Sequence, residues 1–148
     1  MIRYSLAWRA WRSTARKLPD LAQILRRGNS TLSPGERELI ASYVSSLNEC
    51  TFTTSSHSAF AAAQLEGGMP LVKQVHKDLD SAAIPDKLHA LLRIAVAVQD
   101  SGRKVTAELV APERAVGASD PEIHDTVLIA ATLCMFARYV DGTGNLRA

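Results

Sequence analysis

The chain has 148 residues, 47% hydrophobic and 22% charged, and 17 Lys and Arg against 15 Asp and Glu give a net charge of +2. This size predicts one globular domain that needs neither a disulfide nor a metal to hold its core, and 2 cysteines are too few for a secreted disulfide framework. We therefore expect a reducing, cytoplasmic location, and no membrane span, because the longest apolar stretch, 127–137, is about half of the roughly 20 residues needed.

The N-terminal segment differs from the rest of the chain in charge. Residues 1–30 carry seven Lys and Arg and a single acid, Asp20. Apolar residues from Leu6 to Trp11 would share one helical face. This pattern favours a helix that packs on the body of the protein or on a partner subunit. Nucleic-acid binding and organelle targeting are the less favoured interpretations. We divide the chain into a basic helical segment, 1–30, and one continuous domain, 31–148, and expect no nucleic acid as a partner.

The remainder of the sequence predicts helices only. Apolar residues recur at helical spacing, and no stretch shows strand alternation or a two-residue hairpin turn. Ser33 and Glu36 indicate a capping box, and Ser119 with Glu122 marks the start of the last helix in the same way. The expected helices span 19–27, 34–48, 49–65, 70–79, 85–99, 105–116 and 119–140. With the N-terminal helix, this is an all-α, single-domain bundle of about seven or eight helices.

Two of these helices have informative faces. In 34–48, an apolar face that includes Ile40 and Val44 is expected to meet the core. The opposite face, expected to meet solvent, holds the polar residues Glu36, Arg37, Ser42, Ser45 and Ser46. The last helix is apolar nearly all round, which predicts a central position or a subunit interface.

Candidate catalytic side chains stand on two consecutive helices, 34–48 and 49–65. If these helices form an antiparallel hairpin about Asn48, Glu38 lies about 15 Å before the turn and His57 about 13.5 Å after it, so the two side chains face each other. Cys50 would lie in the first turn of its helix, where the helix dipole favours the nucleophilic thiolate. A structural reading remains open, with Cys50 and His57 in the core and Glu38 on the surface.

These residues resemble the signature of the alkylhydroperoxidase D-like and carboxymuconolactone decarboxylase superfamily. In that superfamily a glutamate precedes a Cys-x-x-Cys-x-x-x-His helix, and Glu38, Cys50 and His57 match it. The flanking LSPGERELIASYVSSLNEC, SHSAFAAA and FARYVDGTG resemble its peroxidase-related branch, which usually has an asparagine where Ala137 stands. The resemblance implies a helical bundle of the alkylhydroperoxidase D-like type and a homo-oligomer, a trimer or hexamer.

The sequence departs from that motif at Thr53, the position of the second cysteine. In the family this second cysteine is taken to attack the peroxide, and the first cysteine then reacts with the resulting sulfenic acid to form a disulfide. The glutamate and histidine are taken as a proton relay. One reading is a single-thiol peroxidase: Cys50 reduces a small organic hydroperoxide, Glu38 and His57 move protons, and an unidentified external thiol regenerates Cys50. A second is non-redox acid–base chemistry by Glu38 and His57 on a small organic acid or lactone. A third is a non-catalytic binding protein.

Other residues complete the expected site and exclude other chemistry. We expect Thr53, Tyr43 and Arg138 to line the pocket, although Arg138 and Asp141 could instead pair with each other. Cys134, among apolar neighbours, is expected in the core rather than as a disulfide partner of Cys50. The remaining histidines, His76, His89 and His124, have no His or Cys at ligand spacing, so no metal and no cofactor are expected.

Overall fold

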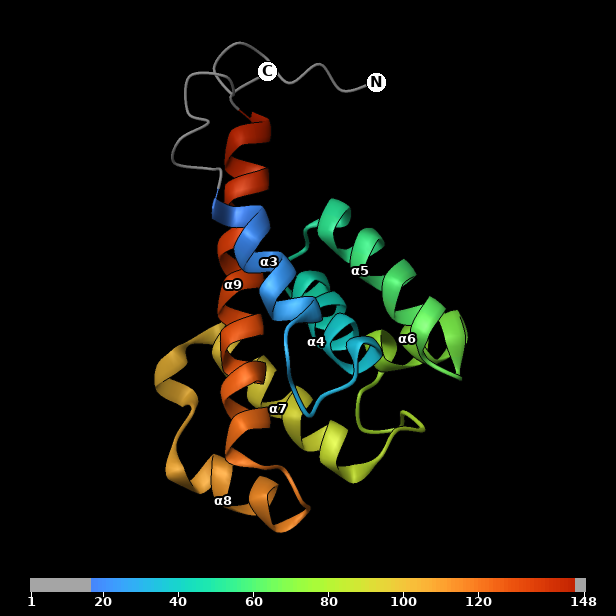
Figure 1. Cartoon of the computed structure of the whole chain (residues 1–148), viewed down its shortest axis with the longest axis vertical. Coiled ribbons are helices and arrows are strands. Elements are labelled where there is room, and N and C mark those ends of the chain that lie inside the picture. Colours follow the sequence, from blue (N-terminus) through green and yellow to red (C-terminus); the bar gives the residue numbers. More distant parts are fainter. Residues whose placement is uncertain (1–16, 146–148) are drawn as a thin grey trace.

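A computed structural model describes residues 17–145 as an all-α bundle, with seven α-helices, one short 3₁₀ turn (η1) and no strand in that range. The elements are α3 (Lys17–Arg27), α4 (Pro34–Leu47), α5 (Thr51–Gln64), α6 (Gly68–Lys77), α7 (Asp86–Asp100), η1 (Gly102–Lys104), α8 (Ala107–Ala115) and α9 (Asp120–Asn145). The expected helix around Leu6 and Trp11 lies outside the described residues. Figure 1 shows α3 lying against the long α9, with α4 and α5 beside them and α8 at the far end of α9.

Helix α4 is the central element, and its expected solvent-facing side is buried. Every residue from Arg37 to Ser45 is buried, because α3, α5, α6, α7 and α9 all pack on this helix. The prediction that Arg37, Ser42 and Ser45 face solvent was therefore wrong. Most of their polar groups are hydrogen-bonded inside the bundle, as in the bond from Ser45 Oγ to the Ala41 carbonyl, whereas Arg37 Nε is buried without a partner among the described residues. Periodicity found the apolar face of α4 but not the helices that cover its other side.

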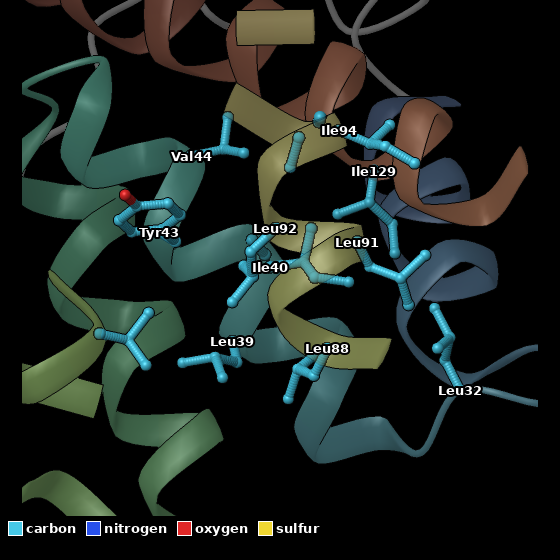
Figure 2. Packing of buried hydrophobic residues seen from close by; sticks show 14 of the residues in the cluster. Leu32, Leu39, Ile40, Tyr43, Val44, Leu88, Leu91, Leu92, Ile94 and Ile129 are labelled. Carbon is cyan, nitrogen blue, oxygen red and sulfur yellow. The ribbon is translucent and has the colours of Figure 1, made fainter. Parts of the chain in front are cut away.

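The core forms where α4, α7 and α9 meet. Figure 2 shows Ile40 and Val44 of α4 facing Leu91 and Leu92 of α7, with Ile129 of α9 beside them. All five side chains are at most 1% exposed. Leu25 of α3 belongs to the same cluster, so α3, although it lies in the basic segment distinguished by sequence, packs on the common core.

Helix α9 is longer than the sequence predicted, continuing past Val140 through Gly142 and Gly144 to Asn145. Its length and composition would allow it to cross a bilayer. However, its apolar stretch is partly buried, and the helix packs on α3, α4 and α7. The helix has one buried face, and Leu128 and Met135 are exposed on the other side. The central position in the described bundle thus belongs to α4.

Two local features set the α4–α5 hairpin. The capping box at Ser33 is present, with Ser33 N–H donating to Glu36 Oε2 at 2.7 Å and Glu36 N–H donating to Ser33 Oγ at 3.2 Å. Gly35 lets the start of α4 approach the end of α5, because a Cβ at this position would lie 2.9 Å from the Leu65 side chain. The hairpin is therefore antiparallel and closely packed, as the sequence predicted.

Candidate active site

The α4–α5 hairpin brings Glu38 and His57 together. Glu38 Oε2 lies 2.6 Å from His57 Nδ1, the contact expected from the hairpin geometry. Both side chains are largely buried, 6% exposed for Glu38 and 12% for His57. Glu38 is therefore not the surface charge of the structural reading. A carboxylate on Nδ1 fixes the orientation and tautomer of an imidazole and leaves Nε2 to exchange a proton with a ligand.

A third charged group, from α3, lies beside this pair. Arg26 Nη1 is 3.7 Å from Glu38 Oε1, the carboxylate oxygen that His57 does not contact. Arg26 Nε donates to the Ala22 carbonyl at 3.0 Å, which holds the guanidinium over the last turn of its own helix. The site thus contains a cation, a carboxylate and an imidazole in a row, drawn from α3, α4 and α5.

His57 lines a cavity of about 270 Å³ that is walled by α3, α5 and α9. Most of the lining side chains are apolar, including Leu18 from α3 and Leu133 and Phe136 from α9. Thr53 lines the same cavity one helical turn before His57, and its Oγ1 donates to the Cys50 carbonyl at 3.3 Å. A small apolar molecule bound here would meet the imidazole and a hydroxyl.

Cys50 lies apart from this cavity. The expected start of its helix at Glu49 was wrong: Glu49 adopts a left-handed conformation (φ 57°), so α5 begins at Thr51 and Cys50 is its N-cap. Cys50 is 1% exposed, and its thiol donates to Asp141 Oδ1 of α9 at 3.4 Å. Cys50 is not among the residues that line the cavity with His57. Both Cys50 and Cys134 are free thiols.

Tyr43 and Arg138, also expected to line the pocket, are elsewhere. Tyr43 packs beside the ring of His76, with 6.1 Å between ring centroids, and its pKa is raised by burial and by the nearby Asp80 and Asp78. Arg138 is exposed and donates to the Cys134 carbonyl at 3.1 Å, so the pairing of Arg138 with Asp141 is not formed. Neither residue lines the cavity that holds His57.

The other histidines have separate structural partners. His76 Nε2 lies 2.6 Å from Ser42 Oγ, and His89 Nε2 lies 3.0 Å from the Ala82 carbonyl. His124 is exposed beside Asp125. Within residues 17–145, no group of three or more His, Cys, Asp or Glu side chains is arranged to hold a metal ion.

The contribution of α3 to the site was not predicted. Arg26 and the apolar residues of α3 reach the cavity only because that helix crosses α9, and no spacing in the sequence specifies this crossing. The available signal was the basic, amphipathic character of the segment, which predicted packing on the body of the protein but not a position.

Comparison with known proteins identifies the fold. No protein-family model and no curated protein matches the chain. One similar solved structure is the alkylhydroperoxidase AhpD core of an uncharacterized peroxidase-related protein from Ralstonia eutropha JMP134, at 23% identity and a TM-score of 0.84, over 93% of this chain and 72% of that chain. Another is an uncharacterized peroxidase-related protein from Silicibacter sp. TM1040, at 24% identity and a TM-score of 0.81, over 89% of this chain and 69% of that chain. Residues 17–145 therefore have the all-α fold of the alkylhydroperoxidase AhpD core.

Proposed function

We propose that this protein is an alkylhydroperoxidase-like, peroxidase-related enzyme in which Glu38 and His57 transfer protons for a small organic substrate held in the apolar cavity. The observation that carries the proposal is the 2.6 Å contact between Glu38 Oε2 and His57 Nδ1 at the wall of that cavity. A buried carboxylate that orients an imidazole is a common general acid–base arrangement. Support for the peroxidase-related class comes from the two similar structures and from the residues that resemble that branch.

The cavity restricts the substrate to a small, largely apolar molecule. Its volume of about 270 Å³ is just below the usual range for ligand pockets, about 300–1,000 Å³. Phe136 and the largely exposed Phe52 are among the apolar side chains that line it. An apolar ligand that fills the cavity would displace water from the wall that holds His57.

Reduction of an organic hydroperoxide is the first candidate reaction. The Cys50 sulfur attacks the terminal peroxide oxygen, an S–O bond forms as the O–O bond breaks, and the leaving alkoxide takes a proton through His57. The products are Cys50 sulfenic acid and an alcohol, and an external thiol then reduces the sulfenic acid. Since Cys50 is covered by Asp141 and lies off the cavity, this route requires its thiol to leave that carboxylate.

Non-redox acid–base chemistry on a small organic acid or lactone is the second candidate. The observation that favours it is the position of Thr53, which brings a hydroxyl rather than a thiol to the cavity that holds His57. Here His57 would take a proton from the substrate and return it, while Thr53 would orient the substrate by hydrogen bonding. This route needs no movement of Cys50.

A trapping experiment separates the two candidates. The reduced protein is exposed briefly to cumene hydroperoxide with dimedone present, and intact mass is measured for the wild type, Cys50→Ser and the matched control Cys134→Ser. Thiol chemistry predicts one adduct in the wild type and in Cys134→Ser that is absent from Cys50→Ser. In parallel, the wild type and His57→Ala are assayed on cumene hydroperoxide and on a small, largely apolar lactone, γ-octalactone.

The proposal expects at least one of those reactions to slow by about a hundredfold in His57→Ala, as the loss of a general acid–base does. Cys50-independent turnover of the lactone would select the second candidate. If the wild type converts neither probe, or if His57→Ala is as active as the wild type on both, the enzymatic proposal fails and a binding role replaces it.

A further inference from the structure

We propose that Arg26 binds the carboxylate of the substrate, so that the ligand of this cavity is a small monocarboxylic acid with an apolar body. The inference rests on the proposed function only in using the same cavity. It deepens that function by naming a substrate class: a carboxylic acid that carries a hydroperoxide for the first candidate reaction, and a simple organic acid for the second.

The position of Arg26 carries the inference. Its side chain lines the His57 cavity and also a neighbouring pocket of about 370 Å³ that Glu38 and Arg27 line. It is 25% exposed, so it is partly desolvated but reachable from solvent. A ligand in the His57 cavity therefore meets the Arg26 side chain, whose guanidinium lies beside Glu38 at the neighbouring pocket.

The hydrogen-bonding capacity of Arg26 is largely unused. Nε donates to the Ala22 carbonyl at 3.0 Å. The separation of 3.7 Å between Nη1 and Glu38 Oε1 is longer than a hydrogen bond. Within the described residues, neither Nη atom makes a hydrogen bond. A guanidinium presents its Nη donors in a planar fork that fits a carboxylate bidentately.

Among the residues that line the cavity, no acidic side chain competes for Arg26, and Glu38, 3.7 Å from Nη1, lies outside that lining. Apart from His57, the side chains that line it with Arg26 are apolar or carry a neutral hydroxyl, and Glu38 is not among them. Apolar walls strengthen the attraction between a bound carboxylate and Arg26, because the effective dielectric constant there is lower than in water. The same walls accommodate the hydrocarbon part of the acid.

The shared carboxylate of Glu38 fixes the orientation of such a ligand. Glu38 Oε1 faces Arg26 and Glu38 Oε2 faces His57, so the guanidinium and the imidazole stand on either side of one carboxylate. An acid held by Arg26 places the carbons next to its carboxylate near His57. The proposed proton transfer then acts at that end of the molecule, and the apolar tail extends between α3, α5 and α9.

The experiment is isothermal titration calorimetry of the full chain with two probes, octanoate and 1-octanol, which share a chain length and differ in charge. The variants are Arg26→Gln and the matched control Arg27→Gln. Arg27 neighbours Arg26 on the same helix and its loss changes the net charge equally, but it does not line the His57 cavity. Arg26→Lys keeps the charge without the fork, and thermal unfolding checks that each variant is folded.

We expect octanoate to bind the wild type more tightly than 1-octanol. Arg26→Gln should weaken octanoate binding by about tenfold or more, the scale of a lost charged hydrogen bond, and change 1-octanol binding less than about twofold. The affinity of Arg26→Lys for octanoate should lie between those of the wild type and Arg26→Gln. Arg27→Gln should bind both probes as the wild type does. The inference would be overturned if octanoate does not bind, or if Arg26→Gln weakens the binding of both probes equally. It would also be overturned if Arg27→Gln weakens octanoate binding as much as Arg26→Gln does.

This result is separable from the test of the proposed function. Binding is measured without turnover, so Arg26-dependent binding of octanoate together with His57-independent chemistry would reject only the proton-transfer proposal. His57-dependent turnover together with Arg26-independent binding would reject only the carboxylate site.

Discussion

At the scale of single residues, the site combines an acid–base pair with a hydroxyl where a thiol would complete the resembled motif. Thr53 lines the cavity with His57, whereas the only nearby cysteine of the helix, Cys50, is buried against Asp141. A threonine hydroxyl can orient a ligand by hydrogen bonding but cannot be oxidised to a sulfenic acid. Residue 53 therefore decides which chemistry the Glu38–His57 pair can assist.

A second residue-scale feature, His76, gives the protein a pH-dependent stability. Burial lowers the pKa of His76 from its ordinary value of 6.5, and its Nε2 lies against Ser42 Oγ. Because the folded protein then binds a proton less readily than the unfolded chain, this group lowers the free energy of unfolding as pH falls below 6.5 and has no effect well above it.

Urea unfolding of the wild type and His76→Gln at pH 7.5 and 5.0 tests this. The loss of stability between the two pH values should be smaller in His76→Gln than in the wild type. The control His124→Gln, which replaces an exposed histidine, should keep the wild-type loss. An unchanged pH dependence in His76→Gln would contradict the assignment.

Some of the site could be predicted from the sequence, because it depends on local geometry. Helix rise and hairpin length place Glu38 opposite His57, and the contact forms at 2.6 Å. The positions of Arg26, Tyr43 and Arg138 depend on how helices cross one another, which no local spacing fixes. The thiol contact of Cys50 with Asp141 joins residues 91 positions apart, and it exists only because α9 continues past Val140.

At the scale of elements, local sequence signals predicted helix starts better than they predicted the end of α9. The capping boxes at Ser33 and Ser119 predicted helix starts correctly, since both sets of side chain to backbone bonds are present. The C-terminal signal at Asp141-Gly142 did not stop α9, which continues to Asn145 with Asp141, Gly142 and Gly144 exposed. The penalty for glycine within a helix is only about 1 kcal/mol, which is too small to end a helix by itself.

Arg37 links α4 to α3 and supplies a prediction at this scale. It is 4% exposed, and its Nη1 donates to the carbonyls of Leu25 at 3.2 Å and Gly28 at 2.9 Å, at the C-terminal end of α3. Replacing it by methionine removes both bonds and leaves these carbonyls without their donor. We expect Arg37→Met to lower the free energy of unfolding by about 1.5–3 kcal/mol.

Urea denaturation checks this value, with Arg27→Gln as the control for loss of a basic residue from the same region. Arg27 is exposed, so its loss should change the stability by less than about 0.5 kcal/mol. If Arg37→Met is as stable as Arg27→Gln, the bonds from Arg37 do not hold α3 in place.

At the scale of the whole molecule, the surface retains large apolar side chains. Phe52 and Phe60 of α5 are 61% and 43% exposed, and Leu128 and Met135 of α9 are 38% and 42% exposed. Between Thr51 and Gln64, His57 is the only ionisable side chain, so the exposed face of α5 carries no charge. Uncharged helix faces with exposed aromatic residues are typical of protein–protein interfaces.

We propose that this face of α5 joins copies of the chain into a homo-oligomer, a trimer or hexamer. Light scattering coupled to size-exclusion chromatography should give a mass that is a multiple of 16.0 kDa. Phe60→Glu should shift the mass towards the monomer, because a charge would be buried at the interface. The control Val116→Glu replaces an exposed apolar residue outside α5 and should not. A monomeric wild type at micromolar concentration would contradict the proposal.

The most direct test of the central claim, that Glu38 and His57 serve the cavity as a proton relay, is to place a thiol beside them. Thr53→Cys and its neighbour control Thr54→Cys, which does not line the cavity, are made in a Cys50→Ser background. The rate of sulfenic-acid trapping by dimedone is then measured with cumene hydroperoxide. The account predicts that Thr53→Cys reacts about a hundredfold faster than Thr54→Cys and loses that advantage with His57→Ala. Equal rates at the two positions, or a fast reaction that survives His57→Ala, would contradict it.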